Sequence, residues 1–176
     1  MVSDPKGAEV KGEAAGPVEA VIILGHGSRV PDAGKDMEKV AGRLSEKYGY
    51  RLVEICNMSR IGPHFPEIFE KCVKRGATRV LVVPYFLHSG IHLLLDIPEM
   101  LQEEARKFPG VTVQMGRSFG FDELLVDLLR ERIEETRSSI DVRQLVLPPK
   151  EKYPVPDGQC EFVPMPPHEA AKYRQE

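Results

Sequence analysis

The chain has 176 residues, of which 41% are hydrophobic and 29% are charged, and its formal net charge is −3 at pH 7. These values are typical of one globular domain with appendages, and without an excess of basic residues they argue against nucleic-acid binding. No apolar run approaches the about 20 residues that cross a bilayer, so we expect no membrane association. The three cysteines form no Cys-x-x-Cys pair and no export signal opens the sequence, which predicts a cytoplasmic protein.

Residues 1–16 are rich in Lys, Glu, Ala and Gly without an apolar period, which predicts a flexible N-terminal tail. From residue 17 to residue 140, β-branched apolar runs alternate with stretches whose apolar residues recur at helical spacing. Four such strand-then-helix units predict one α/β domain, a three-layer α/β/α sandwich around a four-stranded parallel sheet. The predicted strands are 18–24, 51–58, 78–85 and 111–115, and the predicted helices are 32–48, 63–75, 96–108 and 121–137.

Residues 141–176 form a proline-rich C-terminal extension. Because proline fixes φ and removes a backbone donor, we expect an extended chain here, with a short helix at 168–174. Two interpretations stay open for this segment. It is disordered, or its scattered apolar residues hold it along the domain or a neighbouring subunit.

The motif Gly25-His26-Gly27-Ser28-Arg29 directly follows the first apolar strand. Open α/β sheets bind ligands beyond the carboxyl ends of their strands, so His26 is expected at a binding site. The two glycines let the backbone bend sharply and approach a ligand, while Ser28 and Arg29 add a hydroxyl and a cation. The alternative is a plain strand-to-helix turn whose histidine has a capping role.

A second cluster follows the third strand, where His88, Ser89, Gly90 and His92 lie close together in the sequence. Loops after the first and third strands of a parallel sheet open on the same edge, so we expect His26 and His92 to face one cleft. Neutral imidazole suits Co, Ni, Fe or Zn and can also accept a proton near neutral pH. For His88 the intervening Ser89-Gly90 favours a loop, which makes ligation by His88 the weaker alternative.

Three charged residues near these motifs have a structural and a functional interpretation. Asp96 precedes Ile97-Pro98 and is typical of a helix N-cap, with a role as partner of an imidazole as the alternative. Glu99 in the first turn is favoured by the helix dipole, with a carboxylate near the metal as the less favoured alternative. Arg117 follows the fourth strand, where its guanidinium could meet an anionic substrate or simply face solvent.

Taken together, two motifs resemble those of the small class II chelatases, the family of sirohydrochlorin cobaltochelatases, nickelochelatases and ferrochelatases. One is the Gly25–Arg29 turn; the other runs through Pro84-Tyr85-Phe86-Leu87, Gly90-Ile91-His92 and Asp96-Ile97-Pro98. The resemblance extends over about residues 18–137. It implies that His26 and His92 form the catalytic, metal-handling pair. It also implies substrate binding by Gly27, Ser28, Arg29, Ser89 and Gly90, with His88, Asp96 and Arg117 as further candidates.

The resemblance further implies a lyase that inserts Co²⁺ into sirohydrochlorin, releasing two protons, in cobalamin (tetrapyrrole) biosynthesis. Ni²⁺ or Fe²⁺ insertion into the same substrate is the nearest alternative, and no tightly bound cofactor is expected. The expected partners are the tetrapyrrole, the divalent metal ion and a second copy of the chain in a homodimer.

One departure from the family keeps other functions open. Members of the family often carry a glutamate after the second strand, where this chain has Met-Ser-Arg-Ile-Gly-Pro at 58–63. The departure leaves the metal open, and His88 or His64 is a candidate substitute for the missing group. It also admits a non-catalytic tetrapyrrole or metal carrier. A histidine phosphatase is disfavoured, because that family has arginine directly before its histidine and Gly25 stands there.

Overall fold

A computed structural model of the chain describes residues 16–28, 30, 32–59, 62–149 and 152. The predicted N-terminal tail, the helix expected at 168–174 and most of the proline-rich extension lie outside the described residues. Contacts divide the chain into two units, Met1–Arg137 and Ser138–Glu176, of which the first carries the sheet. Among the described residues, no helix combines the length and the apolar character needed to span a membrane. The cytoplasmic location stays a prediction.

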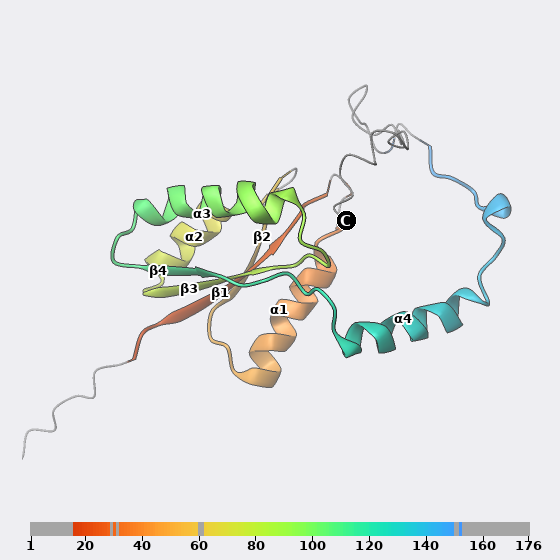
Figure 1. Cartoon of the computed structure of the whole chain (residues 1–176), viewed down its shortest axis with the longest axis horizontal. Coiled ribbons are helices and arrows are strands. Elements are labelled where there is room, and N and C mark those ends of the chain that lie inside the picture. Colours follow the sequence, from red (N-terminus) through yellow and green to blue (C-terminus); the bar gives the residue numbers. More distant parts are fainter. Residues whose placement is uncertain (1–15, 29, 31, 60–61, 150–151, 153–176) are drawn as a thin grey trace, which may run out of the picture. The chain divides into compact units, whose positions relative to one another are not determined.

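Four parallel strands form one sheet in the order β2-β1-β3-β4 (Figure 1). The central strand β1 pairs with β2 on one side and with β3 on the other, and its residues from Ala20 onward are buried. Burial on both faces explains its uninterrupted apolar run. The predicted α/β sandwich with a four-stranded parallel sheet is confirmed. The strands are β1 Glu19–Gly25, β2 Val53–Asn57, β3 Arg79–Pro84 and β4 Thr112–Met115.

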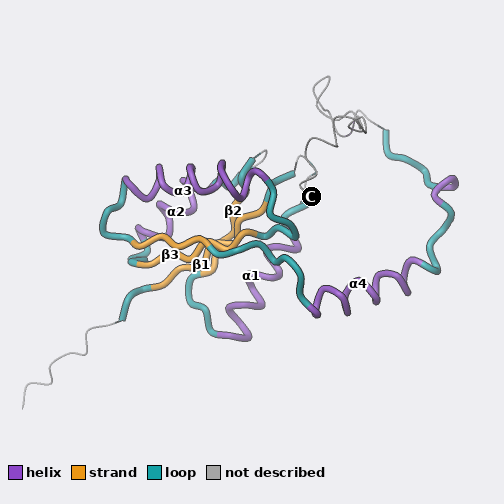
Figure 2. Tube along the Cα trace, in the orientation of Figure 1, coloured by secondary structure: helices purple, strands orange, loops and turns teal. Residues whose placement is uncertain are grey.

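Helices cover both faces of the sheet (Figures 1 and 2). The first helix, α1, lies against one face, and α2 and α3 lie against the other. A five-residue π-helix, His92–Asp96, runs directly into α3. The α-helices are α1 Lys35–Tyr48, α2 Phe65–Lys74, α3 Ile97–Arg106 and α4 Glu123–Thr136, and a short 3₁₀ turn, Val142–Gln144, lies in the second unit.

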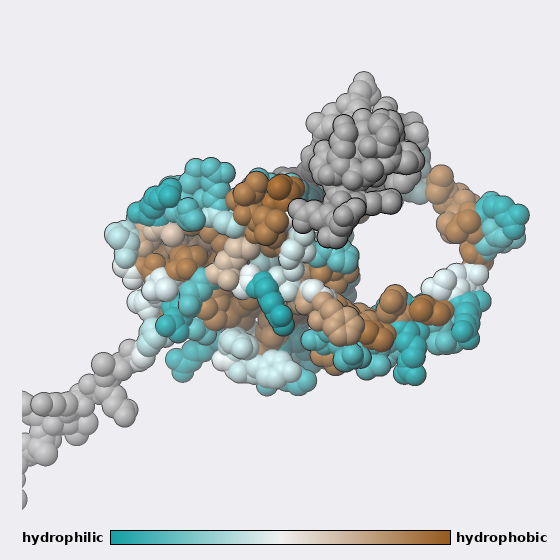
Figure 3. All heavy atoms as spheres, viewed as in Figure 1, coloured by the Kyte–Doolittle hydropathy of each residue, from teal (hydrophilic) through white to brown (hydrophobic). Residues whose placement is uncertain are grey.

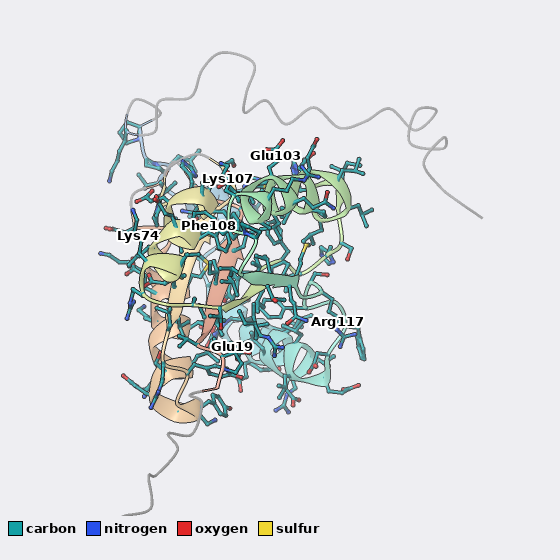
Figure 4. All side chains as sticks on the ribbon, turned by 90° about the vertical axis from the view of Figure 1, so that its left-hand side faces the viewer. Glu19, Lys74, Glu103, Lys107, Phe108 and Arg117 are labelled. Atoms are coloured by element: carbon teal, nitrogen blue, oxygen red, sulfur yellow. The ribbon has the colours of Figure 1, made fainter. Side chains whose placement is uncertain are left out.

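The larger core lies between the sheet and the pair α2 and α3. The rings of Phe65 and Phe69 stack with centroids 5.3 Å apart, and Phe108, labelled in Figure 4, packs edge-on against Phe69 at 5.3 Å. Phe65 and Phe69 have no exposed surface. Each buried phenylalanine contributes about 1.5–3 kcal/mol to folding. This core fixes the helix that begins with His92.

The smaller core lies under α1, where Met37 and Ala41 cover Val21 and Ile23 of β1. The spacing of apolar residues in the predicted helix 32–48 also puts Val40 and Tyr48 on this helix face, but both side chains are exposed. Tyr48 is 62% exposed, because it is the last residue of α1, where the chain turns away at Gly49.

Two element boundaries differ from the prediction for visible reasons. The first helix begins at Lys35 rather than Asp32, because Asp32 has φ of +67°, which no α-helical residue adopts. The third helix is preceded by the π-helix His92–Asp96, here also called the π-turn, which the spacing of apolar residues did not reveal. The last helix, α4, buries none of its side chains among the described residues, and Figure 3 shows hydrophobic residues along it.

Candidate active site

The His26 loop is tied down by backbone hydrogen bonds to the segment that follows β2. The Met58 amide donates to the Gly25 carbonyl at 2.8 Å, and the Ser59 amide donates to the His26 carbonyl at 3.1 Å. The Ser59 hydroxyl donates to the same His26 carbonyl at 3.1 Å. These bonds fix the backbone on which the imidazole stands, at the carboxyl end of β1.

Gly27 is required by this arrangement. Its φ of +92° lies in the region that side chains rarely adopt, and a Cβ on it would lie 1.9 Å from the Ser59 carbonyl oxygen. Only glycine lets the loop approach Ser59 this closely. The second glycine of the motif therefore has a structural role that needs no ligand.

His92 is held differently, as the first residue of the π-helix His92–Asp96. The Ile97 amide donates to the His92 carbonyl, which closes the wider turn. Pro98 has no amide hydrogen, so the ordinary α-helical bond to Leu94 cannot form at that point. Leu93 and Ile97 are buried in the larger core and anchor the turn.

The two imidazoles meet at one edge of the sheet. The ring centroids of His26 and His92 are 5.8 Å apart, with the ring planes at 65°. Phe86 packs its ring against His26 at 6.3 Å and 68°. The two histidines converge in the structure, as expected from the sequence, whereas their chemical roles stay predictions.

Asp96 is not the N-cap that the sequence favours. Its backbone is helical and its side chain makes no capping hydrogen bond. Its carboxylate Oδ2 instead lies 2.5 Å from Nδ1 of His92. The N-cap interpretation is wrong because the π-turn continues the helix back to His92, and the alternative, a partner for an imidazole, is the contact observed.

The other predicted site residues divide into those at the same edge and those without a described contact there. The Ser28 hydroxyl accepts from the Val30 amide at 3.0 Å, and the Gly90 carbonyl accepts from the Leu93 amide at 3.0 Å. The Ser89 hydroxyl lies 3.0 Å from that of Ser118, which is buried. The remaining candidates are His88 and Arg117, both exposed (Arg117 is labelled in Figure 4), and Arg29, which lies outside the described residues.

Sequence reasoning missed two residues that support His26, namely Phe86 and Ser59. The strand register would have revealed Phe86. Leu24 of β1 pairs with Pro84 of β3, and His26 and Phe86 each follow two residues later, just beyond the strand ends, where their rings meet. For Ser59 the sequence carries no comparable signal, because its bond depends on how the loop after β2 turns.

A cleft of about 590 Å³ opens beside His26, between the end of β1 and the start of α1. His92 is not among the residues that line it. The charged side chains at the cleft include Lys35, which is paired with Asp32 at 3.1 Å. Cys56 lies one residue before Asn57 of the cleft wall, and burial raises the pKa of its thiol to about 12. This thiol is therefore protonated at neutral pH.

A metal ion at this edge would have few protein ligands. In the described part of the chain, no group of three or more His, Cys, Asp or Glu side chains is arranged to hold a metal. Two imidazoles alone leave the remaining coordination positions to water or to an incoming ligand. Such a site can hand a metal over rather than retain it.

Comparison with known proteins agrees with this geometry. Residues 20–136 match the CbiX family. A sirohydrochlorin ferrochelatase of Priestia megaterium is 36% identical over 119 residues, 68% of this chain and 45% of that protein. A sirohydrochlorin cobaltochelatase of the same organism is 37% identical over 116 residues, 66% of this chain and 38% of that protein.

Among solved structures, the sirohydrochlorin chelatase SirB from Bacillus subtilis subspecies spizizenii in complex with cobalt superposes with a TM-score of 0.62. Its identity is 31%, over 66% of this chain and 50% of that chain. The chain thus spans half or less of the length of these three relatives. The resemblance to class II chelatases is confirmed. Because the family match extends over well more than half of its residues, the chain belongs to the CbiX family.

Proposed function

We propose that this protein inserts a divalent metal ion into sirohydrochlorin. The observation that carries the proposal is the pair of facing imidazoles, His26 and His92, 5.8 Å apart at the carboxyl edge of a parallel sheet. The names of the relatives, which include both a ferrochelatase and a cobaltochelatase of sirohydrochlorin, support the substrate.

The reaction needs metal delivery and proton removal. Two pyrrole N–H groups lose their protons, the ring nitrogens bind the metal ion through the freed electron pairs, and two protons leave. No covalent bond to the enzyme forms. Imidazole nitrogens can serve both tasks, because a neutral imidazole binds a borderline metal ion and accepts a proton near neutral pH.

Among the metals, we place Co²⁺ first, with Ni²⁺ and Fe²⁺ as alternatives. Imidazole ligation suits all three, so affinity alone does not choose between them. The cobalt-bound relative supports the first choice, while the ferrochelatase relative supports iron equally well. The place of the reaction in cobalamin biosynthesis depends on this choice and is part of the proposal.

The substrate carries carboxylates, which need donors at the rim of the site. Ser28 and Ser89 stand near the two histidine loops and provide hydroxyls, and Arg117 provides an exposed guanidinium beyond β4. Arg29, from the same motif as His26, is the further candidate cation. We propose that these groups bind the acid side chains of the macrocycle.

The test is metal insertion in vitro. Purified protein is mixed with sirohydrochlorin and Co²⁺, Ni²⁺ or Fe²⁺ without oxygen, and the absorbance change of the macrocycle is compared with the spontaneous rate. We expect acceleration, fastest with Co²⁺. Absence of acceleration with all three metals contradicts the proposal. If metallated product binds tightly in that case, the carrier function gains support instead.

We also propose that two copies of the chain associate. A 14-residue helix with a broad apolar face is marginal alone in water, yet α4 exposes Leu124 to 77% and Leu129 to 62%. A second copy would cover this face. The exposed apolar residues of α4 are Leu124, Val126, Leu128, Leu129 and Ile133.

Light scattering tests this association. The variant Leu128→Glu places a charge on the apolar face, and we expect it to reduce the measured mass from dimer to monomer. Arg130→Glu places the same side chain on the polar face of α4 and should leave the dimer intact. A monomeric wild-type protein contradicts the homodimer without touching the proposed chemistry.

A further inference from the structure

We propose that Asp96 is a positioning residue for His92, holding the imidazole with hydrogen on Nδ1 so that Nε2 is the nitrogen that meets metal or substrate. The inference rests on the proposed function for its chemical consequence, since metal delivery and proton removal are the steps that would use this nitrogen. Its structural part, the state of the His92 ring, stands on the contact alone.

The contact joins Oδ2 of Asp96 to Nδ1 of His92 at 2.5 Å. Both side chains are partly exposed, His92 to 45% and Asp96 to 55%, so the pair opens toward solvent rather than into the core. An exposed polar contact of this kind adds little to stability. Its position beside His26 therefore points to a role in the site rather than in folding.

The π-turn explains why these two side chains meet. Residues four apart on a helical turn lie on the same face, so the side chains of His92 and Asp96 can meet. His92 and Asp96 are the first and last residues of this turn. Leu93 and Ile97, each one residue later, point into the core and hold both ends of the turn in place.

The chemistry of the contact selects one tautomer. An ionised carboxylate accepts hydrogen bonds and donates none, so the nitrogen facing it must carry hydrogen. In a neutral imidazole the other nitrogen, Nε2, then holds the free electron pair. That electron pair is what binds a metal ion or takes up a pyrrole proton. Carboxylates commonly orient metal-binding histidines in this way.

The two histidines of the pair differ in this respect. Nδ1 of His26 lies 3.3 Å from the carbonyl oxygen of its neighbour Gly27, a long contact with a neutral group. The carboxylate contact belongs to His92. Loss of Asp96 should therefore disturb one member of the pair and leave the other as it is.

Three variants test the proposal by kinetics. Asp96→Ala removes the acceptor, Asp96→Glu keeps a carboxylate on a longer side chain, and Glu99→Gln removes an acidic charge from the same helix start. Partners of this kind affect activity by about 10–100-fold. We expect a loss of that size in kcat/KM for Asp96→Ala, partial recovery for Asp96→Glu, and less than a twofold change for Glu99→Gln.

Nitrogen-resolved NMR of the histidine rings provides the readout that a purely structural role would not move. In the wild-type protein without metal, at a pH where the ring is neutral, we expect the His92 signals of the Nδ1–H tautomer. Asp96→Ala should shift them toward the Nε2–H tautomer and leave those of His26 unchanged. Should Asp96→Ala fold poorly, the wild-type spectrum still decides the tautomer.

Two results overturn the proposal. One is a wild-type His92 with hydrogen on Nε2; the other is an Asp96→Ala protein that keeps the wild-type tautomer, whatever its rate. A wild-type protein that accelerates no metal insertion refutes the proposed function instead. The NMR measurement is then still decisive for Asp96, so the two failures are distinguishable.

Discussion

Two loops at one edge of the sheet present the histidines, and they hold them by different means. The loop after β1 holds His26 through backbone bonds to Ser59 and through the conformation of Gly27. The turn before α3 holds His92 through the Asp96 side chain and through buried neighbours. The position of His26 is thus fixed by backbone geometry, and that of His92 by side-chain contacts. The first should be sensitive to any added Cβ, and the second to loss of a single acceptor.

The largest effect is expected when one of the two facing histidines is removed. His26→Ala and His92→Ala should each lower kcat/KM for metal insertion by about 100-fold or more, because each deletes a nitrogen that we propose binds the metal or accepts a proton. His88→Ala removes an exposed imidazole from the same loop as His92 and should change the rate by less than about threefold. Steady-state kinetics with sirohydrochlorin measures all three. Equal losses of kcat/KM in all three variants would mean that His26 and His92 contribute no more to the reaction than His88 does.

A smaller but still large effect is expected from the backbone of the His26 loop. Gly27→Ala forces a Cβ to within 1.9 Å of the Ser59 carbonyl at a strained φ. We expect a loss of about 1–3 kcal/mol in the free energy of unfolding and a lower rate, because the His26 loop must move. Gly34→Ala, at a position where an added Cβ would meet no atom within 4 Å, is the control and should change little. Denaturant unfolding that gives equal stabilities would refute the structural role of Gly27.

Phe86 provides a gentler way to disturb His26 alone. Its ring meets the imidazole at 6.3 Å, and such aromatic contacts contribute about 0.5–1.5 kcal/mol. Phe86→Leu should therefore lower kcat/KM by about two- to tenfold, while the His92 tautomer stays unchanged. Phe119→Leu removes a ring that packs on Tyr85 instead and serves as the control. A change in the His92 tautomer in Phe86→Leu would show that the two loops are coupled.

The smallest effect is expected from Cys56 in β2, the strand whose following residues bind the His26 loop. Burial raises the pKa of Cys56 to about 12 from an ordinary value of 9.0. The unfolded chain therefore loses this thiol proton first, and stability falls as pH rises from about 9 toward 12. At pH 10 the loss from Cys56 is about 1 kcal/mol. Urea unfolding at pH 8 and pH 10 under reducing conditions should show a smaller decline for Cys56→Ala than for wild type. Equal declines would mean that the thiol ionises in the folded protein.

The sequence was sufficient to predict the sheet and the meeting of His26 with His92. Both follow from apolar runs and from the rule that parallel strands end at one edge. It was not sufficient for the Asp96 contact, because Asp before Ile-Pro is equally typical of an N-cap, and only the π-turn decides between them. The exposed face of α4 was also beyond prediction, since an amphipathic pattern does not say which surface covers it.

We propose joint action of His26 and His92, as one unit, on one metal ion. Its most direct test is a double-mutant cycle with His26→Ala, His92→Ala and the combined variant, measured as kcat/KM for metal insertion into sirohydrochlorin. Groups that act as a unit are strongly non-additive, so we expect the combined variant to be about as slow as the slower single variant. Losses that multiply in the combined variant would show that the two histidines act independently, and would contradict their joint action.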